Sequence, residues 1–160
     1  MFFRVAAISV IALSLAACAE PVRPIQVWSP QAAAQASIGS IVITNAASQV
    51  PEDAVQALQT ALEQKLSQCA AGPDKYDMLV RLDNFKLANT GMVMLVGDSH
   101  EVAAEVKFVR PEDKGVVAEY YVQERTSGGG LIGLAKLSGG SRAISTDFAK
   151  SICEKVFRKS

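Results

Sequence analysis

The feature that most constrains this 160-residue chain lies at its amino end, where small residues lead to a cysteine. Residues 1–4 carry one positive charge, and residues 5–15 form an apolar run that Ala16, Ala17 and Cys18 close. This order of charge, apolar run and small residues is typical of a signal peptide. The apolar run is shorter than the roughly 20 residues of a transmembrane helix, so a permanent membrane span is not expected.

Two ways of processing this leader fit the residues. In the first, a lipoprotein peptidase cuts before Cys18, whose sulfur carries diacylglycerol and whose new amino group is acylated. In the second, Ala17-Cys18-Ala19 is an ordinary A-x-A cleavage site and the product carries no lipid. Leu15, three residues before the cysteine, favours the lipoprotein. The sequence therefore predicts a signal peptide over residues 1–17 and a lipidated Cys18, whose several acyl chains would anchor the protein to a membrane.

The residue after this cysteine indicates where the protein is located, and the net charge indicates which partners are not expected. Ala19 stands there rather than Asp, and by resemblance to bacterial lipoprotein sorting this points to the outer membrane, with the domain facing the periplasm. Without Arg4, the 16 basic residues of the chain become 15, against 16 acidic ones. Such a balance gives no field that would steer nucleic acid, so a nucleic-acid partner is not expected.

Two cysteines remain once Cys18 is assigned to the lipid. Cys69 and Cys153 form an even pair in an oxidising compartment, and both fall on predicted helices that share one face of the sheet. We expect a disulfide between them; the alternative is two buried free thiols. Because these thiols are far apart in sequence and His100 is the only histidine, neither a metal site nor a cofactor is expected.

The chain after the leader divides into a tether and one domain. Residues 18–37 contain prolines and a run of Ala and Gln, which predicts a flexible tether; its Trp28 docks on the domain, rests at the lipid interface or contacts a partner, docking being favoured. Residues 38–160 show the apolar patterns of a single periplasmic domain. The expected elements are strand 38–44, helix 51–69, strand 76–87 with a bulge near Asn84, strand 101–110, a turn at 111–115, strand 116–125 and helix 141–158.

This order of strand, helix, three strands and helix predicts an α+β fold. Two helices would cover one face of a mostly antiparallel four-stranded sheet, which gives a sandwich of two layers.

Two apolar stretches interrupt the pattern. Residues 91–97 are expected either to extend a strand over the core, which is favoured, or to present an apolar loop to lipid or a partner. Residues 127–140 have glycines at both ends and an apolar middle, so the stretch can move while its centre favours burial. The candidate partner or ligand contacts are Met92, Met94, Leu95, Leu131, Ile132 and Leu134.

Two motifs with catalytic or cofactor associations do not fit their context. Gly128, Gly130 and Gly133 match G-x-G-x-x-G, but no parallel strand with an acidic residue follows them, as a dinucleotide site requires. Asp98-Ser99-His100 contains the residue types of a hydrolytic triad, but a triad is spatial and consecutive residues cannot form its relay. No catalytic residue is therefore assigned, and an enzyme is not expected.

The glycine stretch and the last helix carry a resemblance. Gly128 to Gly133, followed by Asp147-Phe148-Ala149, is similar to a group of small proteobacterial outer-membrane lipoproteins of unknown function that have a lipobox and a glycine-rich segment before the final helix. More distantly, the element order resembles the periplasmic domains of the curli-secretion lipoprotein and of auxiliary lipoproteins of lipid-transporting ABC systems. Fold likeness does not transfer function, and no catalytic residues are carried over.

Two functions fit these expectations. The first is a non-catalytic envelope lipoprotein, held on the membrane by its lipid, whose periplasmic domain is a protein-interaction or assembly module for an envelope protein partner. The alternative is a lipid- or small-ligand-handling accessory of an envelope transport system. A partner surface would leave apolar side chains exposed, whereas a ligand site would form a concave apolar pocket.

Overall fold

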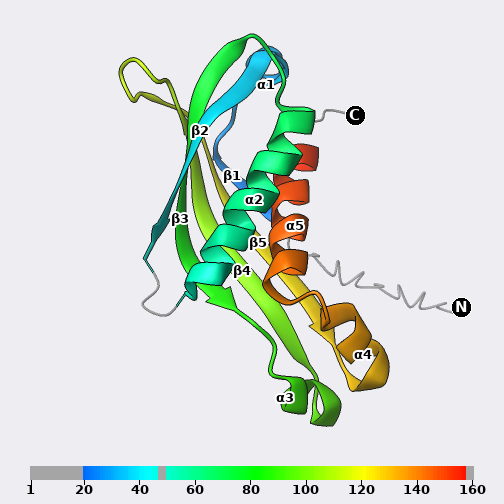
Figure 1. Ribbon diagram of the computed structural model, residues 1–160. Coiled ribbons are helices and arrows are strands. Elements are labelled where there is room, and N and C mark those ends of the chain that lie inside the picture. The colour runs from blue at the N-terminus through cyan, green and yellow to red at the C-terminus, as the bar shows by residue number, and fades with distance from the viewer. Residues whose placement is uncertain (1–19, 47–49, 158–160) are drawn as a thin grey trace, which may run out of the picture.

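One mixed sheet organises the computed structural model, which describes residues 20–46 and 50–157. Its strands are β1 (Val22–Gln26), β2 (Ala36–Asn45), β3 (Asp74–Lys86), β4 (Asp98–Val109) and β5 (Val116–Gly128). They lie in the order β1-β5-β4-β3-β2 (Figure 1). β2 runs parallel to β3, and the other neighbouring strands are antiparallel. The α+β class is confirmed, but the sheet has five strands rather than the expected four.

The extra strand comes from the segment expected to be a tether. The described part of that segment, residues 20–37, forms β1, helix α1 (Pro30–Gln35) and the start of β2, so the flexible tether is wrong there. The prolines that suggested a coil suit these elements: Pro24 lies on an edge strand, and Pro30 begins a helix. What fixes the segment is burial, because Val22 and Trp28 are each only 4% exposed.

Two long helices cover one face of the sheet, as expected (Figure 1). These are α2 (Glu52–Cys69) and α5 (Gly140–Ile152), the latter continued by a π-helical turn, η1 (Cys153–Phe157). The predicted helix 51–69 is confirmed, and Leu58, Leu62 and Leu66, spaced four residues apart along it, are buried. α5 buries Ile144, Phe148 and Ile152 on its inner side. The other face of the sheet has no helix on it in the described part of the chain.

The strand connections follow the sequence closely. α2 carries the chain from β2 to β3, and a crossover of this kind lets consecutive strands pair in parallel. The predicted bulge is present as a register shift between Leu82 and Asn84. β4 and β5 form the expected hairpin, whose turn is fixed by Asp113; its carboxylate accepts hydrogen bonds from the Arg110 guanidinium and from the Gly115 backbone N–H, which lowers the Asp113 pKa to about 2.

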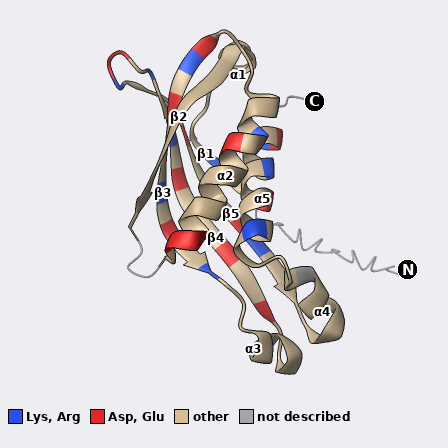
Figure 2. Ribbon diagram, viewed as in Figure 1, with Lys and Arg blue, Asp and Glu red and all other residues tan. Residues whose placement is uncertain are grey.

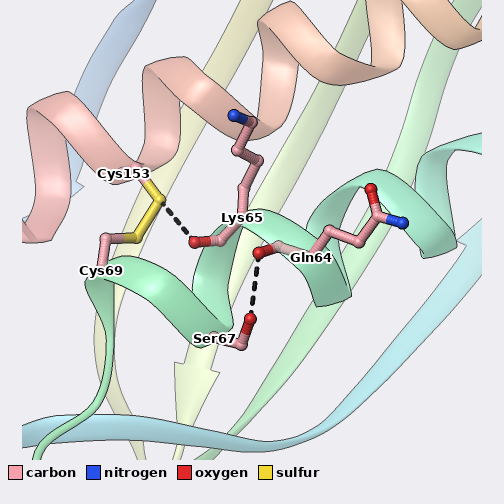
Figure 3. Close-up of a disulfide and its surroundings, with 5 residues drawn as sticks. All are labelled: Gln64, Lys65, Ser67, Cys69 and Cys153. Carbon is pink, nitrogen blue, oxygen red and sulfur yellow. Dashed lines mark hydrogen bonds between the residues drawn. A yellow bond between two sulfur atoms is a disulfide. The ribbon is translucent and has the colours of Figure 1, made fainter.

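The predicted disulfide joins the ends of the two long helices (Figure 3). Cys69 at the end of α2 and Cys153 just after α5 are bonded, with their Cα atoms 5.7 Å apart. The Cys153 Sγ also lies 3.2 Å from the backbone carbonyl oxygen of Lys65, one turn back on α2 (Figure 3). The crosslink therefore pins the carboxyl ends of both helices together on one face of the sheet.

The aromatic residues of the core gather at this same end. The Trp28 ring centroid lies 4.9 Å from those of Tyr76 and Phe108 and 5.7 Å from that of Phe157. The Trp28 backbone N–H also donates a hydrogen bond to the Tyr120 hydroxyl, at 3.3 Å. Docking of Trp28 on the domain is thus confirmed. We call the region formed by this aromatic cluster and the disulfide the closed end.

Candidate interaction surfaces

The first apolar stretch is a short helix, α3 (Thr90–Leu95), so the favoured strand extension is wrong. Asn89 caps it, because the side-chain oxygen accepts hydrogen bonds from the backbone N–H groups of Gly91 (2.9 Å) and Met92 (3.2 Å). Gly97 ends the helical segment with a φ of +84°, a left-handed conformation that glycine adopts without strain. A strand would have left these capping groups unused.

The second apolar stretch forms α4 (Gly130–Leu137), and its glycines have a structural role. A Cβ added to Gly128 would lie 2.5 Å from the Gly133 Cα, which shows that the end of β5 touches the first turn of α4 directly. Gly130 has a φ of +62° and reverses the chain between the two elements. The G-x-G-x-x-G match therefore reflects a tight fold-back, and helix α5 rather than a strand follows it.

α3 and α4 pack against each other at the end of the sheet opposite α1 (Figure 1). Together they expose six apolar side chains, which we call the apolar tip. The exposed fractions are 48% for Met92, 45% for Met94, 82% for Leu95, 74% for Val96, 74% for Leu131 and 77% for Ile132.

Five of the six candidate contact residues from the sequence thus lie together on the tip. The sixth, Leu134, is half-buried, and Val96 joins the set instead. Val96 continues the same apolar run, so the signal for it was in the sequence. The inner sides of the two helices are held by Val93 and Leu137, which are buried.

His100 connects both helices of the tip to the sheet. Its Nδ1 accepts a hydrogen bond from the Ala88 backbone N–H at 3.0 Å, just before α3. Its Nε2 lies 2.9 Å from the Leu137 carbonyl oxygen, at the end of α4. Nδ1 can accept only when it is unprotonated, so the ring is assigned as the Nε2–H tautomer, which donates to Leu137. His100 is buried and therefore serves as an internal brace.

The two residues before His100 make separate contacts. The Asp98 carboxylate accepts hydrogen bonds from Lys86 (2.6 Å) and from the Asn89 backbone N–H (2.9 Å), which hold the Asp98 pKa far below its usual range. The Ser99 hydroxyl donates to Glu101 at 2.7 Å. Asp98, Ser99 and His100 thus each take part in separate structural contacts. In the described part of the chain, no group of His, Cys, Asp or Glu could hold a metal ion.

A hollow of about 690 Å³ lies between α3 and the end of β5. Its lining runs from Val93 to Asp98 on one side and from Ser127 to Gly130 on the other, with Arg125 between them. The hollow is open to solvent, and its wall combines the apolar residues 93–96 with four glycines. A hollow this open would leave a ligand in contact with water.

The uncovered face of the sheet is a second candidate surface, and it carries ion pairs. Figure 2 shows that the strands of the sheet contain charged residues. Glu105 at the centre of this face forms ion pairs with Arg81 and Lys107, and the nitrogen–oxygen distance is 2.7 Å in each. Both cations lower the Glu105 pKa, Lys107 more strongly. Beside this cluster, Val42 and Leu79 are paired across β2 and β3 and remain 48% and 38% exposed. The face therefore combines a charged cluster with a small apolar area.

β2 borders this face as an edge strand of ten residues, none of them charged. The other edge, β1, has five residues and includes both Arg23 and Pro24. Charges and prolines are the usual devices that keep an edge strand from pairing with another chain. β1 has both of them, and β2 has neither.

Comparison with known proteins places the fold. No protein-family model matches the sequence, and no curated protein does. Among solved structures, the fold is similar to the PelC dodecamer from Paraburkholderia phytofirmans, at 13% identity and a TM-score of 0.58, over 86% of this chain and 98% of that one. It is also similar to protein XCC0632 (DUF330) from Xanthomonas campestris, at 12% identity and a TM-score of 0.54, over 82% and 90%. At these identities the likeness establishes the fold alone.

The remaining predictions from the leader concern residues that the structure does not describe. The signal peptide over residues 1–17 and the lipidated Cys18 lie in the segment 1–19. Among the described residues, no helix is long and apolar enough to cross a membrane.

Proposed function

We propose that this chain is a non-catalytic envelope lipoprotein, anchored through Cys18, whose folded domain is an assembly module that joins a second copy of itself. The observation that carries the proposal is the uncharged edge strand β2 beside the uncovered sheet face. Addition of a strand to an exposed edge is a common mode of protein recognition, in which main-chain hydrogen bonds supply affinity.

The geometry of β2 supports such pairing. In the described part of the chain, the backbone of residues 39–44 makes no main-chain hydrogen bond outside its ladder with β3. Its outer side therefore presents donors and acceptors along an extended segment. Val42 and Leu79 next to this edge supply an apolar area that a neighbouring sheet would cover.

The fold likeness gives independent support. PelC from Paraburkholderia phytofirmans, which has a similar fold, forms a dodecamer. A helix-covered sheet of this kind is thus compatible with ordered self-assembly. Its chemistry also fits a non-catalytic role, because the polar groups that the sequence placed side by side, Asp98, Ser99 and His100, are each used in structural contacts.

Native mass spectrometry of the protein extracted from membranes in mild detergent tests this proposal. We expect an acylated oligomer for the wild type and an acylated monomer for Val42→Lys, since a charge placed on the edge opposes strand pairing. Val27→Lys is the matched control, because Val27 is 68% exposed and lies off the sheet. An acylated wild type that stays monomeric would contradict self-assembly, and a mass without acyl groups would contradict the anchor.

The runner-up function, a lipid- or small-ligand-handling accessory, has one observation in its favour. This is the hollow of about 690 Å³ beside the tip, which is large enough for a small ligand. The same mass spectra test it, because a carrier would retain a lipid or ligand mass beyond the acyl groups on Cys18. The exposed apolar side chains around the hollow favour a contact surface over a ligand cavity.

A further inference from the structure

We infer that the apolar tip is a second membrane contact, which dips into the lipid surface that holds the Cys18 anchor. The inference rests on the proposed lipidation of Cys18, but it concerns a different site from the β2 edge. It assigns the exposed side chains of α3 and α4 to lipid, and it orients the domain on the membrane.

The first step is the direction in which the chain enters the domain. β1 is antiparallel to β5, with Val22 opposite Val122 and Gln26 opposite Glu119. Pro21 continues this pairing, since its carbonyl oxygen accepts a hydrogen bond from the Gln123 backbone N–H at 2.7 Å. β5 runs toward the tip and ends at Gly128. The chain before Pro21 therefore reaches the domain from the side of the tip.

The second step is the short distance between this point and the anchor. Cys18 precedes Pro21 by three residues, which span at most about 10 Å when extended. Gly128 lies five residues beyond Gln123, or about 17 Å along the strand. Even fully extended, the chain to the lipidated cysteine therefore ends at least about 7 Å short of Gly128, so the tip projects beyond the anchor by at least this distance. The predicted tether of 20 residues would have allowed many orientations, but this connection allows few.

The third step is the chemistry of the tip. Its six exposed side chains are all aliphatic or methionine. The sequence has no charged residue from 87 to 97 and only Lys136 from 126 to 140, and Figure 2 shows no acidic or basic colour on α3. The nearest acid, Asp98, is paired with Lys86 at 2.6 Å. An anionic lipid surface does not repel a tip that has no unpaired acid. Transfer of its aliphatic side chains out of water is favourable.

The depth also agrees with a lipid contact. Apolar faces of interfacial helices lie about 5–10 Å into the boundary between headgroups and acyl chains. A projection of at least about 7 Å beyond a lipid-linked cysteine is enough for the tip to reach this zone. Protein contact surfaces are enriched in aromatic residues, arginine and methionine; the tip has methionines but no aromatic residue or arginine, and most of its exposed side chains are aliphatic. The observations therefore favour lipid over a protein partner at this site.

The experiment measures tryptophan quenching by brominated lipids. Acylated Leu131→Trp protein is reconstituted into vesicles of phosphatidylethanolamine and phosphatidylglycerol, with bromine placed high or low on the acyl chains. We expect lipids brominated near the headgroup to lower the added fluorescence about twofold, and deeper bromines to lower it less. The exposure of Leu131, 74%, makes the substitution tolerable for the fold.

Two controls come from the chain itself. The native Trp28 is buried at the closed end and should be unquenched in the wild-type protein. Val27→Trp is the matched exposed control, because Val27 lies beside that end and away from the tip. Equal quenching of Leu131→Trp and Val27→Trp would overturn the orientation.

Three other outcomes overturn the inference in distinguishable ways. Vesicle-bound Leu131→Trp that is unquenched by any brominated lipid refutes the tip contact and leaves the anchor intact. Shielding from aqueous iodide without quenching by lipid places a protein on the tip instead. Wild-type protein that does not float with the vesicles refutes the anchor and the tip contact together.

Discussion

Apolar side chains are buried at the closed end of the sheet and exposed at the tip. At the closed end, Trp28 from the amino-terminal segment packs against Phe108 from β4 and Phe157 from η1, so three distant segments enclose one cluster. At the tip, α3 has six residues and α4 has eight, and each buries only its inner side. Leu131 and Ile132 stay more than 70% exposed as a result. Helices this short cannot surround their own apolar residues, so the tip leaves them exposed to solvent.

The two ends also differ in the contacts that hold their helices to the sheet. The closed end combines the disulfide with the aromatic cluster and ties both long helices to the sheet. The tip is tied to the sheet by the short-range contacts of Val93, Leu137 and His100. Elements with few buried contacts open first, so amide exchange is expected to be faster in α3 and α4 than in α2.

Removing the disulfide should have the largest effect on the comparison. The bond closes a loop with a sequence separation of 84, and a crosslink of that length stabilises by about 4 kcal/mol in the chain-entropy model. Cys69→Ala with Cys153→Ala should therefore lower the free energy of unfolding by about this amount in urea titrations. Because this effect acts mainly on the unfolded chain, it should leave local opening at the tip, and hence the exchange rates of α3 and α4, close to those of the wild type.

Reductant supplies the control for this prediction. It should destabilise the wild type to nearly the level of the double variant and should have no effect on the double variant itself. Equal stability of oxidised and reduced wild type would mean that the aromatic cluster alone holds the closed end.

The brace at the tip should have a smaller and more local effect. His100→Ala leaves the Ala88 N–H and the Leu137 carbonyl without their partner, and an unpaired buried group costs about 1–3 kcal/mol. We expect a loss of about 2 kcal/mol in free energy of unfolding and faster amide exchange in α3 and α4.

Leu131→Ala is the matched change on the tip for comparison with His100→Ala. Because Leu131 is 74% exposed, its removal should change stability by less than about 0.5 kcal/mol. If exchange in α3 and α4 is unaltered in His100→Ala, the two helices are held to the sheet by their apolar contacts instead.

The same contrast explains what the sequence could predict. The stripe of Leu58, Leu62 and Leu66 and the alternation of β4 are periodic over many residues, so the long elements and the buried cysteine pair were predictable. β1 was missed because Pro24 signals coil locally, whereas pairing with a strand about 100 residues later decided the outcome. α3 was missed because a seven-residue apolar run has no period that separates helix from strand. Asn89 before it was the one local signal of a helix start.

The sequence identified most residues of the apolar tip but not their arrangement in space. The two apolar stretches named five of the six tip residues, since glycine-bounded apolar runs stand out in any sequence. Nothing in the local sequence, however, brings α3 beside α4, because the pairing of β4 with β5 does so. The uncharged edge β2 was likewise visible only once the strand order was known.

The smallest expected effect concerns Glu124. This residue belongs to the β5 side chains that face the core, and it lies between the closed end and the tip. Burial raises the Glu124 pKa, partly offset by the Ser151 hydroxyl that donates to its carboxylate, and Asp147 and Glu154 raise it further. Because the folded pKa lies above the unfolded one, wild-type stability falls as the pH rises through the folded pKa. Glu124→Gln should therefore raise the free energy of unfolding at pH 7 by at most about 1 kcal/mol, and the gain should vanish at low pH, where Glu124 is protonated in both states.

Glu105 on the uncovered face is the control of opposite sign. Lys107 and Arg81 lower its pKa, so its contribution to stability is present above the unfolded pKa and is lost as the pH falls through the folded one. Glu105→Gln should destabilise at pH 7 and have no effect at low pH, the reverse of Glu124→Gln. Urea titrations of both variants at pH 7 and at low pH separate the two cases. If both substitutions change the free energy of unfolding in the same direction, the burial of Glu124 under α5 does not control its ionisation. The core then extends less far toward the tip than the position of Glu124 implies.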